Sequence, residues 1–128
     1  MTIFLVTQSF IEEGDVDDGR TGFSLSNDGE GVRRAYVFAD RAEAIGNFVF
    51  RERGREVDLT TANAVVLGHV IAHEAGHLLL PAHSHSMSGI MQPQFDLHAI
   101  DKALNGWLGF SADQRKRIGN VVRTLACS

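Results

Sequence analysis

Two histidines and a glutamate in the middle of the chain have the spacing of a metal-binding helix motif. The segment His73-Glu74-Ala75-Gly76-His77 matches the pattern H-E-x-x-H. Four residues advance an α-helix by about 40° beyond a full turn and by roughly 6 Å, so both imidazoles project from one face. Two neutral imidazoles suit zinc, with Zn–N distances of about 2.0–2.1 Å. The pattern therefore predicts one catalytic Zn²⁺ ion held by His73 and His77.

Glu74 directly follows the first predicted ligand, so it is placed beside the ion without having to ligate it. Zinc lowers the pKa of a bound water molecule to about 7, and a neighbouring carboxylate can take the proton from that water. We therefore predict that Glu74 is the general base of a hydrolytic reaction. The competing interpretation is a buried helix with two polar histidines, which leaves the adjacent histidine and glutamate without a role.

Three more histidines near this motif are candidate ligands. His83 and His85 follow the predicted helix and compete for the position of the third ligand. His69 lies one turn before His73 and could act as a fourth. Because a catalytic zinc keeps one position open for water, we favour His69 as a residue outside the coordination sphere.

A long helix must present the motif. Asp58 and Thr60 are candidate N-caps, and Pro81 ends the helix because proline cannot continue it and restricts Leu80 before it to an extended conformation. The apolar residues of the predicted inward face recur at helical spacing. They are Ala64, Val65, Leu67, Ile71, Ala75 and Leu78.

The other predicted elements are short. Residues 2–8, 21–26 and 33–39 are typical of strands, and the turn signal Asn27-Asp28-Gly29 favours a hairpin between the last two. Helices are expected from Asp40 to about Phe50 and at residues 97–104 and 112–125, the last with a capping box of Ser111 and Gln114. The first of these helices is expected to turn Ala42, Ile45, Phe48 and Val49 inward.

Together these elements predict an α+β fold. A small twisted mixed sheet packs on a backing helix and on the active-site helix, followed by a mostly helical C-terminal part. A chain of 128 residues fits one domain with one core, so we expect residues 1–128 to form a single catalytic domain and a monomer. At this size the cleft should be shallow, which favours loose specificity or a small substrate.

Composition narrows the function classes. The net charge of −4 and the absence of a basic stripe argue against nucleic acid, and no apolar run is long enough to span a membrane. The single cysteine, Cys127, allows neither an intrachain disulfide nor a cysteine zinc cluster.

Asp15, Asp17 and Asp18 could ligate calcium, but they lack the EF-hand pattern, so we favour a solvated loop. The N-terminus lacks the features of a signal peptide, which fits a cytoplasmic protein or a mature secreted form.

From His73 onward the chain reads HEAGHLLLPAHSHSMSGIMQP. This stretch resembles the metzincin metallopeptidases, which pair an extended H-E-x-x-H motif with a later methionine turn. It is most similar to the matrixin group, because Ile90-Met91-Gln92-Pro93 looks like the methionine turn of that group. The resemblance covers the chain from Val65 onward. The pattern HLLL…HS…SGIM, followed by Gly109-Phe110-Ser111 and the last predicted helix, is also similar to small uncharacterised bacterial proteins that are predicted zinc proteases.

The resemblance implies further roles for this segment. Met91 would lie beneath the metal as a hydrophobic base, and Pro93, Gln94 and Phe95 would line the wall of the substrate side-chain pocket. The alternative for Met91 is ordinary core packing.

The chain departs from the family at Leu80, where metzincins have a glycine that permits a sharp turn. Leucine before proline cannot make the same turn. His83 keeps the metzincin spacing, whereas His85 suits a longer turn and matches the bacterial set. We prefer His85 as the third ligand, with His83 as the alternative.

The function implied by the motif and the resemblance is that of a zinc-dependent metalloendopeptidase, which hydrolyses a peptide or protein substrate. An extended peptide could pair with an exposed strand edge, for which residues 33–39 are our candidate. Two alternatives remain. One is a zinc amidase acting on small or cell-wall peptides, and the other is a non-catalytic zinc-binding module, although such a module has no need of Glu74.

Overall fold

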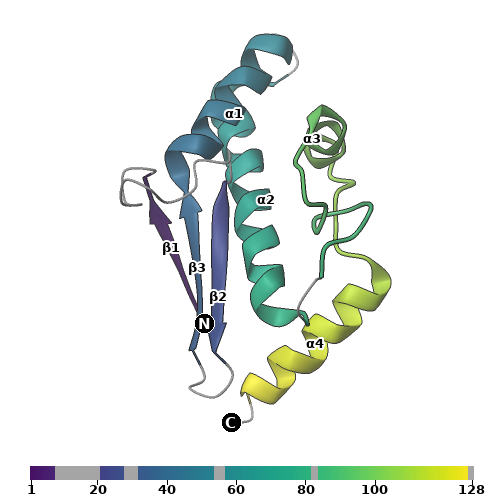
Figure 1. The fold of residues 1–128 in the computed structure, drawn as a ribbon. Helices are drawn as coiled ribbons and strands as arrows, with labels where there is room; N and C mark the ends of the chain where they lie inside the picture. Colours follow the sequence, from purple (N-terminus) through teal and green to yellow (C-terminus); the bar gives the residue numbers. More distant parts are fainter. Residues whose placement is uncertain (8–20, 28–31, 54–56, 82–83, 127–128) are drawn as a thin grey trace.

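The structure is a computed structural model, and it describes residues 1–7, 21–27, 32–53, 57–81 and 84–126. Within these residues the protein is α+β, with one mixed sheet and four helices (Figure 1). The elements in chain order are β1 (Thr2–Val6), β2 (Gly22–Asn27), β3 (Val32–Phe38), α1 (Ala39–Arg53), α2 (Leu59–Leu79), α3 (Leu97–Leu104) and α4 (Ala112–Ala126). The acidic loop considered for calcium, most of the Asn27-Asp28-Gly29 turn, His83 and Cys127 lie outside the described residues.

The sheet has the strand order β1-β3-β2. β1 runs parallel to β3, and β2 runs antiparallel to it, which confirms the pairing expected for a hairpin. Ala35 and Val37 of β3 are fully buried. Our candidate for an exposed edge, residues 33–39, is wrong, because β3 is paired on both sides. Among the described strands, the edge nearer to α2 belongs to β2 (Figure 1).

Helix α1 packs lengthwise on α2. Ala42 and Val49 are buried as predicted, and Ile45 is half-buried. Phe48 is 40% exposed, contrary to the prediction. Each residue turns a helix by about 100°, so Phe48 lies about a quarter-turn from the mean direction of Ala42, Ile45 and Val49.

Helix α2 begins and ends as the sequence indicates. The Asp58 side chain accepts a hydrogen bond from the Thr61 amide at 2.8 Å, and Leu80 before Pro81 is extended with φ −108° and ψ 158°. The predicted inward face is displaced, however: Ala64 is exposed and Val65, Leu67, Ile71 and Ala75 are only half-buried. The buried stripe recurs every four residues and contains Ala62, Val66, Val70, Glu74 and Leu78.

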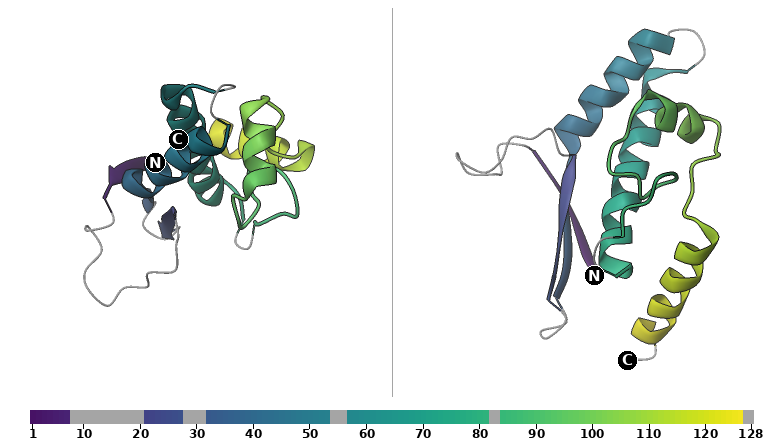
Figure 2. Two further views of the ribbon diagram at one scale, coloured as in Figure 1. Left: turned by 90° about the horizontal axis from the view of Figure 1, so that it is seen from above. Right: turned by 45° about the vertical axis from the view of Figure 1, so that its right-hand side comes forward.

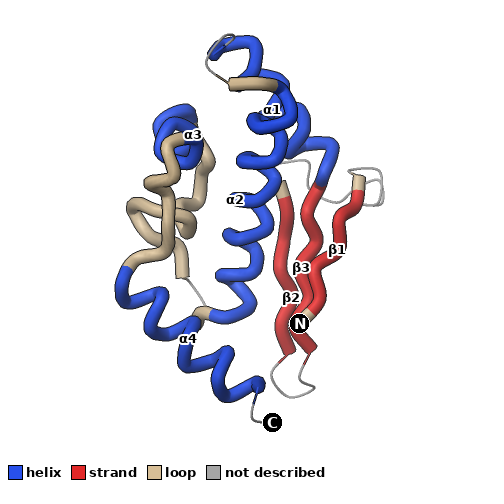
Figure 3. Tube along the Cα trace, turned by 180° about the vertical axis from the view of Figure 1, so that it is seen from behind, coloured by secondary structure: helices blue, strands red, loops and turns tan. Residues whose placement is uncertain are grey.

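The C-terminal part is mostly helical, as predicted. α3 begins at the N-cap Asp96, and α4 has the predicted capping box, with the Ser111 amide donating to Gln114 Oε1 and the Gln114 amide donating to Ser111 Oγ. Figures 2 and 3 place α2 between the sheet on one side and α3, α4 and their connecting loops on the other. None of the described helices combines the length and the hydrophobicity that a membrane span requires.

Candidate metal centre

Three histidine side chains converge on one side of α2. His73 and His77 project from the last turns of the helix, and His85 approaches from the loop beyond Pro81. One ring nitrogen from each lies within 4.8 Å of the others, so the three side chains can hold a metal ion. The structure thus brings together both helix ligands and the preferred third ligand that the sequence predicts.

The donor set fits a zinc-sized cation. The Ile90 carbonyl can only accept a hydrogen bond, so His73 Nδ1, at 2.7 Å from it, carries the proton and Nε2 keeps its lone pair. His73 Nε2 lies 3.1 Å from His77 Nε2. Two nitrogens on a tetrahedral zinc, at about 2.0–2.1 Å from the ion, are separated by about 3.3 Å. Two facing lone pairs at this distance repel unless a proton or a cation lies between them.

The surroundings favour neutral imidazoles. Burial, together with the positive charges that His73 and His85 can carry, lowers the pKa of His77 from 6.5 to about 4. Burial also lowers the pKa of His73, against the opposing effect of its hydrogen bond to Ile90, and that of His85. Neutral imidazole is the form that ligates a metal, so all three side chains are prepared for ligation at neutral pH.

Met91 is fully buried beneath the turn of α2 that carries the histidines. A Cβ atom added at Gly76 would lie only 2.4 Å from Met91 Sδ and 3.0 Å from Phe110 Cε1. The absence of a side chain at Gly76 is therefore what lets the methionine approach the helix. The loop before Met91 turns at Gly89, whose φ of +85° suits glycine.

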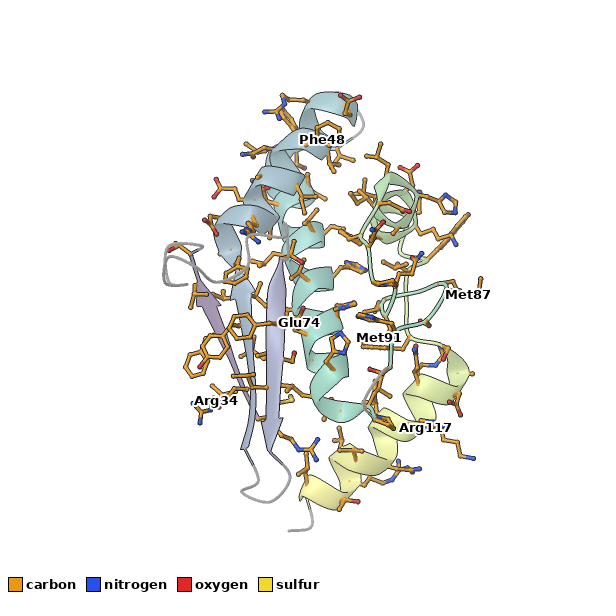
Figure 4. All side chains as sticks on the ribbon, in the orientation of Figure 1. Arg34, Phe48, Glu74, Met87, Met91 and Arg117 are labelled. Atoms are coloured by element: carbon orange, nitrogen blue, oxygen red, sulfur yellow. The ribbon has the colours of Figure 1, made fainter. Side chains whose placement is uncertain are left out.

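Glu74 faces the sheet side of α2, whereas Met91 lies on the opposite side (Figure 4). Glu74 is 5% exposed, and its side chain packs against β2. Ser24 Oγ lies 2.7 Å from Glu74 Oε2 and 2.9 Å from the Glu74 carbonyl oxygen. Sequence reasoning missed Ser24. The available signal was a polar residue at an inward position of a short strand, two residues from Gly22.

A cleft of about 560 Å³ contains the three histidines and Glu74. Its other lining residues come from the start of β2, from α2, and from the segment 89–108. They are Thr21, Gly22, Phe23, Ser24, His69, Val70, Gly89, Ile90, Gln92, Pro93, Phe95 and Leu108. Pro93 and Phe95 therefore line the cleft as expected, whereas Gln94 is exposed and does not.

His69 lies in the cleft but outside the histidine cluster. Its Nδ1 is 2.8 Å from the Val65 carbonyl oxygen, and its ring stacks on Phe95 with centroids 6.1 Å apart. Within the described residues, the group that could hold a metal consists of His73, His77 and His85. This agrees with the interpretation of His69 as a residue outside the coordination sphere.

Comparison with protein-family models, with curated proteins and with solved structures gave no match for this chain. The function of this protein is therefore inferred from the geometry of the cleft.

Proposed function

We propose that this protein is a zinc-dependent metalloendopeptidase. One observation carries the proposal: the three imidazoles of His73, His77 and His85 converge in the same cleft as the carboxylate of Glu74. A site that only binds metal needs the three histidines but not the carboxylate. The added carboxylate, one residue from a ligand, supplies the base that hydrolysis needs.

The chemistry divides between the ion and the protein. A zinc ion bound in this site supplies Lewis acidity, which polarises a carbonyl and makes water a stronger acid. The imidazoles of His73, His77 and His85 would hold the ion through one ring nitrogen each, which in His73 is Nε2. Glu74 accepts the proton of the attacking water on a carboxylate oxygen and then delivers it to the leaving amine nitrogen.

The free edge of β2 offers a place for an extended substrate. Thr21, Gly22, Phe23 and Ser24 line the cleft, and β2 is paired only with β3 among the described strands. A peptide can add to such an edge through backbone hydrogen bonds, which are independent of its sequence. The apolar wall near Pro93 and Phe95 then receives a side chain of that peptide.

The metzincin-like arrangement is part of the proposal. Met91 packs beneath the helix turn of the ligands, as the resemblance implies. The extended conformation of Leu80 supports a longer path from helix to loop than the family glycine allows, and this path favours His85 as the third ligand.

The test compares the unmodified chain with Glu74→Gln, because glutamine keeps the size of the side chain and still accepts a hydrogen bond from Ser24. Both proteins are analysed for zinc and incubated with a peptide library. We expect about one equivalent of zinc in each, and a loss of cleavage of about 10²–10⁴-fold in the variant. A chelator should abolish cleavage by the unmodified chain.

Other results would overturn the proposal. Hydrolysis of small amides without cleavage of any peptide would indicate an amidase. Stoichiometric zinc without turnover by the unmodified chain would indicate a binding module.

A further inference from the structure

We propose that Ser24 is a positioning residue that holds the carboxylate of Glu74 in the orientation required for proton transfer. This inference rests on the proposed function, because it assigns Ser24 a part in the same reaction. Among the described residues, the Ser24 hydroxyl is hydrogen-bonded to Glu74, and it acts on the reaction through that residue.

The position of Ser24 is set by strand pairing. Side chains alternate along a strand, so Gly22 and Ser24 share the face that meets α2, while Phe23 points the other way and stacks on Tyr36. Ser24 lies opposite Ala35 of the central strand. Because Ala35 is fully buried, the backbone that carries the hydroxyl is anchored in the core.

The hydroxyl lies near two oxygen atoms of one residue. It is 2.7 Å from Glu74 Oε2 and 2.9 Å from the Glu74 carbonyl oxygen. A serine hydroxyl has one proton to donate. The hydrogen bond to an ionised carboxylate is the stronger of the two, and its shorter distance agrees with that.

Gly22 holds the same side chain from a second direction. A Cβ atom at Gly22 would lie 3.0 Å from Glu74 Cγ and 3.2 Å from Cδ. The strand backbone therefore packs against the stem of Glu74, while Ser24 binds its end. A glutamate has several side-chain torsions to fix, and fixing them before the reaction removes that entropic cost from the catalytic step.

A role in orientation predicts a particular kinetic signature. A misplacement of about 1 Å in a reacting group can lower the rate roughly 10²-fold. In Ser24→Ala we expect kcat to fall by about 10- to 100-fold, with KM changed less than about twofold, because the substrate contacts remain. Zinc content and zinc affinity should match those of the unmodified chain, since the imidazoles are untouched.

Two further variants separate orientation from general damage to β2. Ser24→Thr keeps the hydroxyl and suits a strand, so it should restore kcat to within a few-fold. Leu25→Ala alters the neighbouring residue, whose side chain is exposed on the opposite face of the sheet, and should leave kcat unchanged. Full kcat in Ser24→Ala, or an equal loss in Leu25→Ala, would overturn the inference.

A measurement on the metal-free protein tests the hydrogen bond itself. In protein labelled with ¹³C at glutamate carboxyl groups, the signal that disappears in Glu74→Gln belongs to Glu74. We expect Ser24→Ala to shift this signal, Ser24→Thr to return it toward its original position, and Leu25→Ala to leave it in place. An unmoved signal in Ser24→Ala overturns the inference even if the enzyme is active.

The failure of the proposed function has a different signature. If the unmodified chain binds zinc but cleaves nothing, the peptidase is refuted and Ser24 has no reaction to serve. If the unmodified chain cleaves peptides and Ser24→Ala cleaves them equally well, only the role of Ser24 is refuted.

Discussion

The two sides of the candidate metal centre are built on different principles. His73 and His77 are held by a single helix, in which the backbone hydrogen bonds of consecutive turns fix their relative position. His85 is held by a loop. The loop is fixed instead by bonds to distant parts of the chain: the Ile90 amide donates to the Gly109 carbonyl, and Gln114 Nε2 donates to Ser86 Oγ at 3.3 Å.

The positions of the two helix histidines are therefore set by local structure, whereas the position of His85 is set by tertiary contacts. The relative position of His73 and His77 follows from the period of the helix over four residues. His85, the candidate third ligand, lies in a loop whose Ser86 is bound by Gln114 of α4, 28 positions further along the chain. We therefore expect changes at the ligand positions of α2 to act directly on metal affinity, and a change at Gln114 of α4 to reach it through the loop.

The largest expected effect is the loss of a ligand. A structural zinc site binds with about 10–16 kcal/mol, so each of three or four ligands accounts for about 3–4 kcal/mol, or roughly 10²–10³ in affinity. We expect losses of this size in His73→Ala, His77→Ala and His85→Ala, measured by competition with a chromophoric chelator. The smallest of the three should be that of His85→Ala, because the helix pair remains.

His83→Ala is the matched control, since it removes the histidine that competes with His85 for the same role. Zinc affinity should remain close to that of the unmodified chain. If His83→Ala loses zinc while His85→Ala keeps it, the assignment of the third ligand must be reversed.

Acid should lower the stability of the metal-free folded protein through protonation of His77. In the folded metal-free protein the pKa of His77 lies at about 4, below its ordinary 6.5. Between these values the unfolded chain binds more protons than the folded one, so the free energy of unfolding should decrease as pH falls from 6.5 toward 4. Denaturant titrations across this range measure the effect. In His77→Ala this part of the pH dependence should disappear, and an unchanged slope would contradict the shift.

The contact between the two sides can be tested at Gly76. In Gly76→Ala the new Cβ would overlap Met91 Sδ, and such overpacking costs about 1–3 kcal/mol. Gly68→Ala is the control on the same helix, because a Cβ there meets nothing within 4 Å. It should stabilise the protein by about 0.5–1 kcal/mol. Chemical denaturation of the metal-free proteins gives both values, and equal stability of the two variants would refute the close packing of Met91.

The smallest expected effect comes from α4. Gln114→Ala removes half of the capping box and the bond to Ser86, which should cost about 1 kcal/mol in stability. If the loop transmits the change, zinc affinity should also fall about tenfold. The control is Arg117→Ala, which removes an exposed ion pair with Asp113 on the same helix and should cost at most about 0.5 kcal/mol. Unaltered zinc affinity in Gln114→Ala would show that the loop holds His85 without help from α4.

The sequence predicted what local rules control. Asp58 and the Ser111–Gln114 pair mark helix starts by their side-chain chemistry, and Pro81 marks a helix end by its geometry. The elements of the α+β fold were therefore located to within a few residues. The spacing of His73 and His77 needed only the helical period.

The features that could not be predicted from the sequence are those that depend on tertiary contacts. An assignment of the buried face by hydrophobicity passes over a carboxylate, so Glu74 was not placed in the buried stripe of α2, although it lies there. The contact of Ser24 with Glu74 depends on which strand occupies the sheet edge, and local patterns do not fix strand order. The position of His85 depends on bonds to Ser86 and Ile90 from residues far along the chain.

The hydrogen bond between His73 Nδ1 and the Ile90 carbonyl gives the site a reciprocal property. Whatever stabilises the imidazole in its ligating tautomer also stabilises the loop that supplies the carbonyl, because a coupling free energy acts equally in both directions. Amide hydrogen exchange in the segment 86–91 should therefore slow when metal binds and accelerate when it is withdrawn. The order of the loop becomes a readout of metal occupancy.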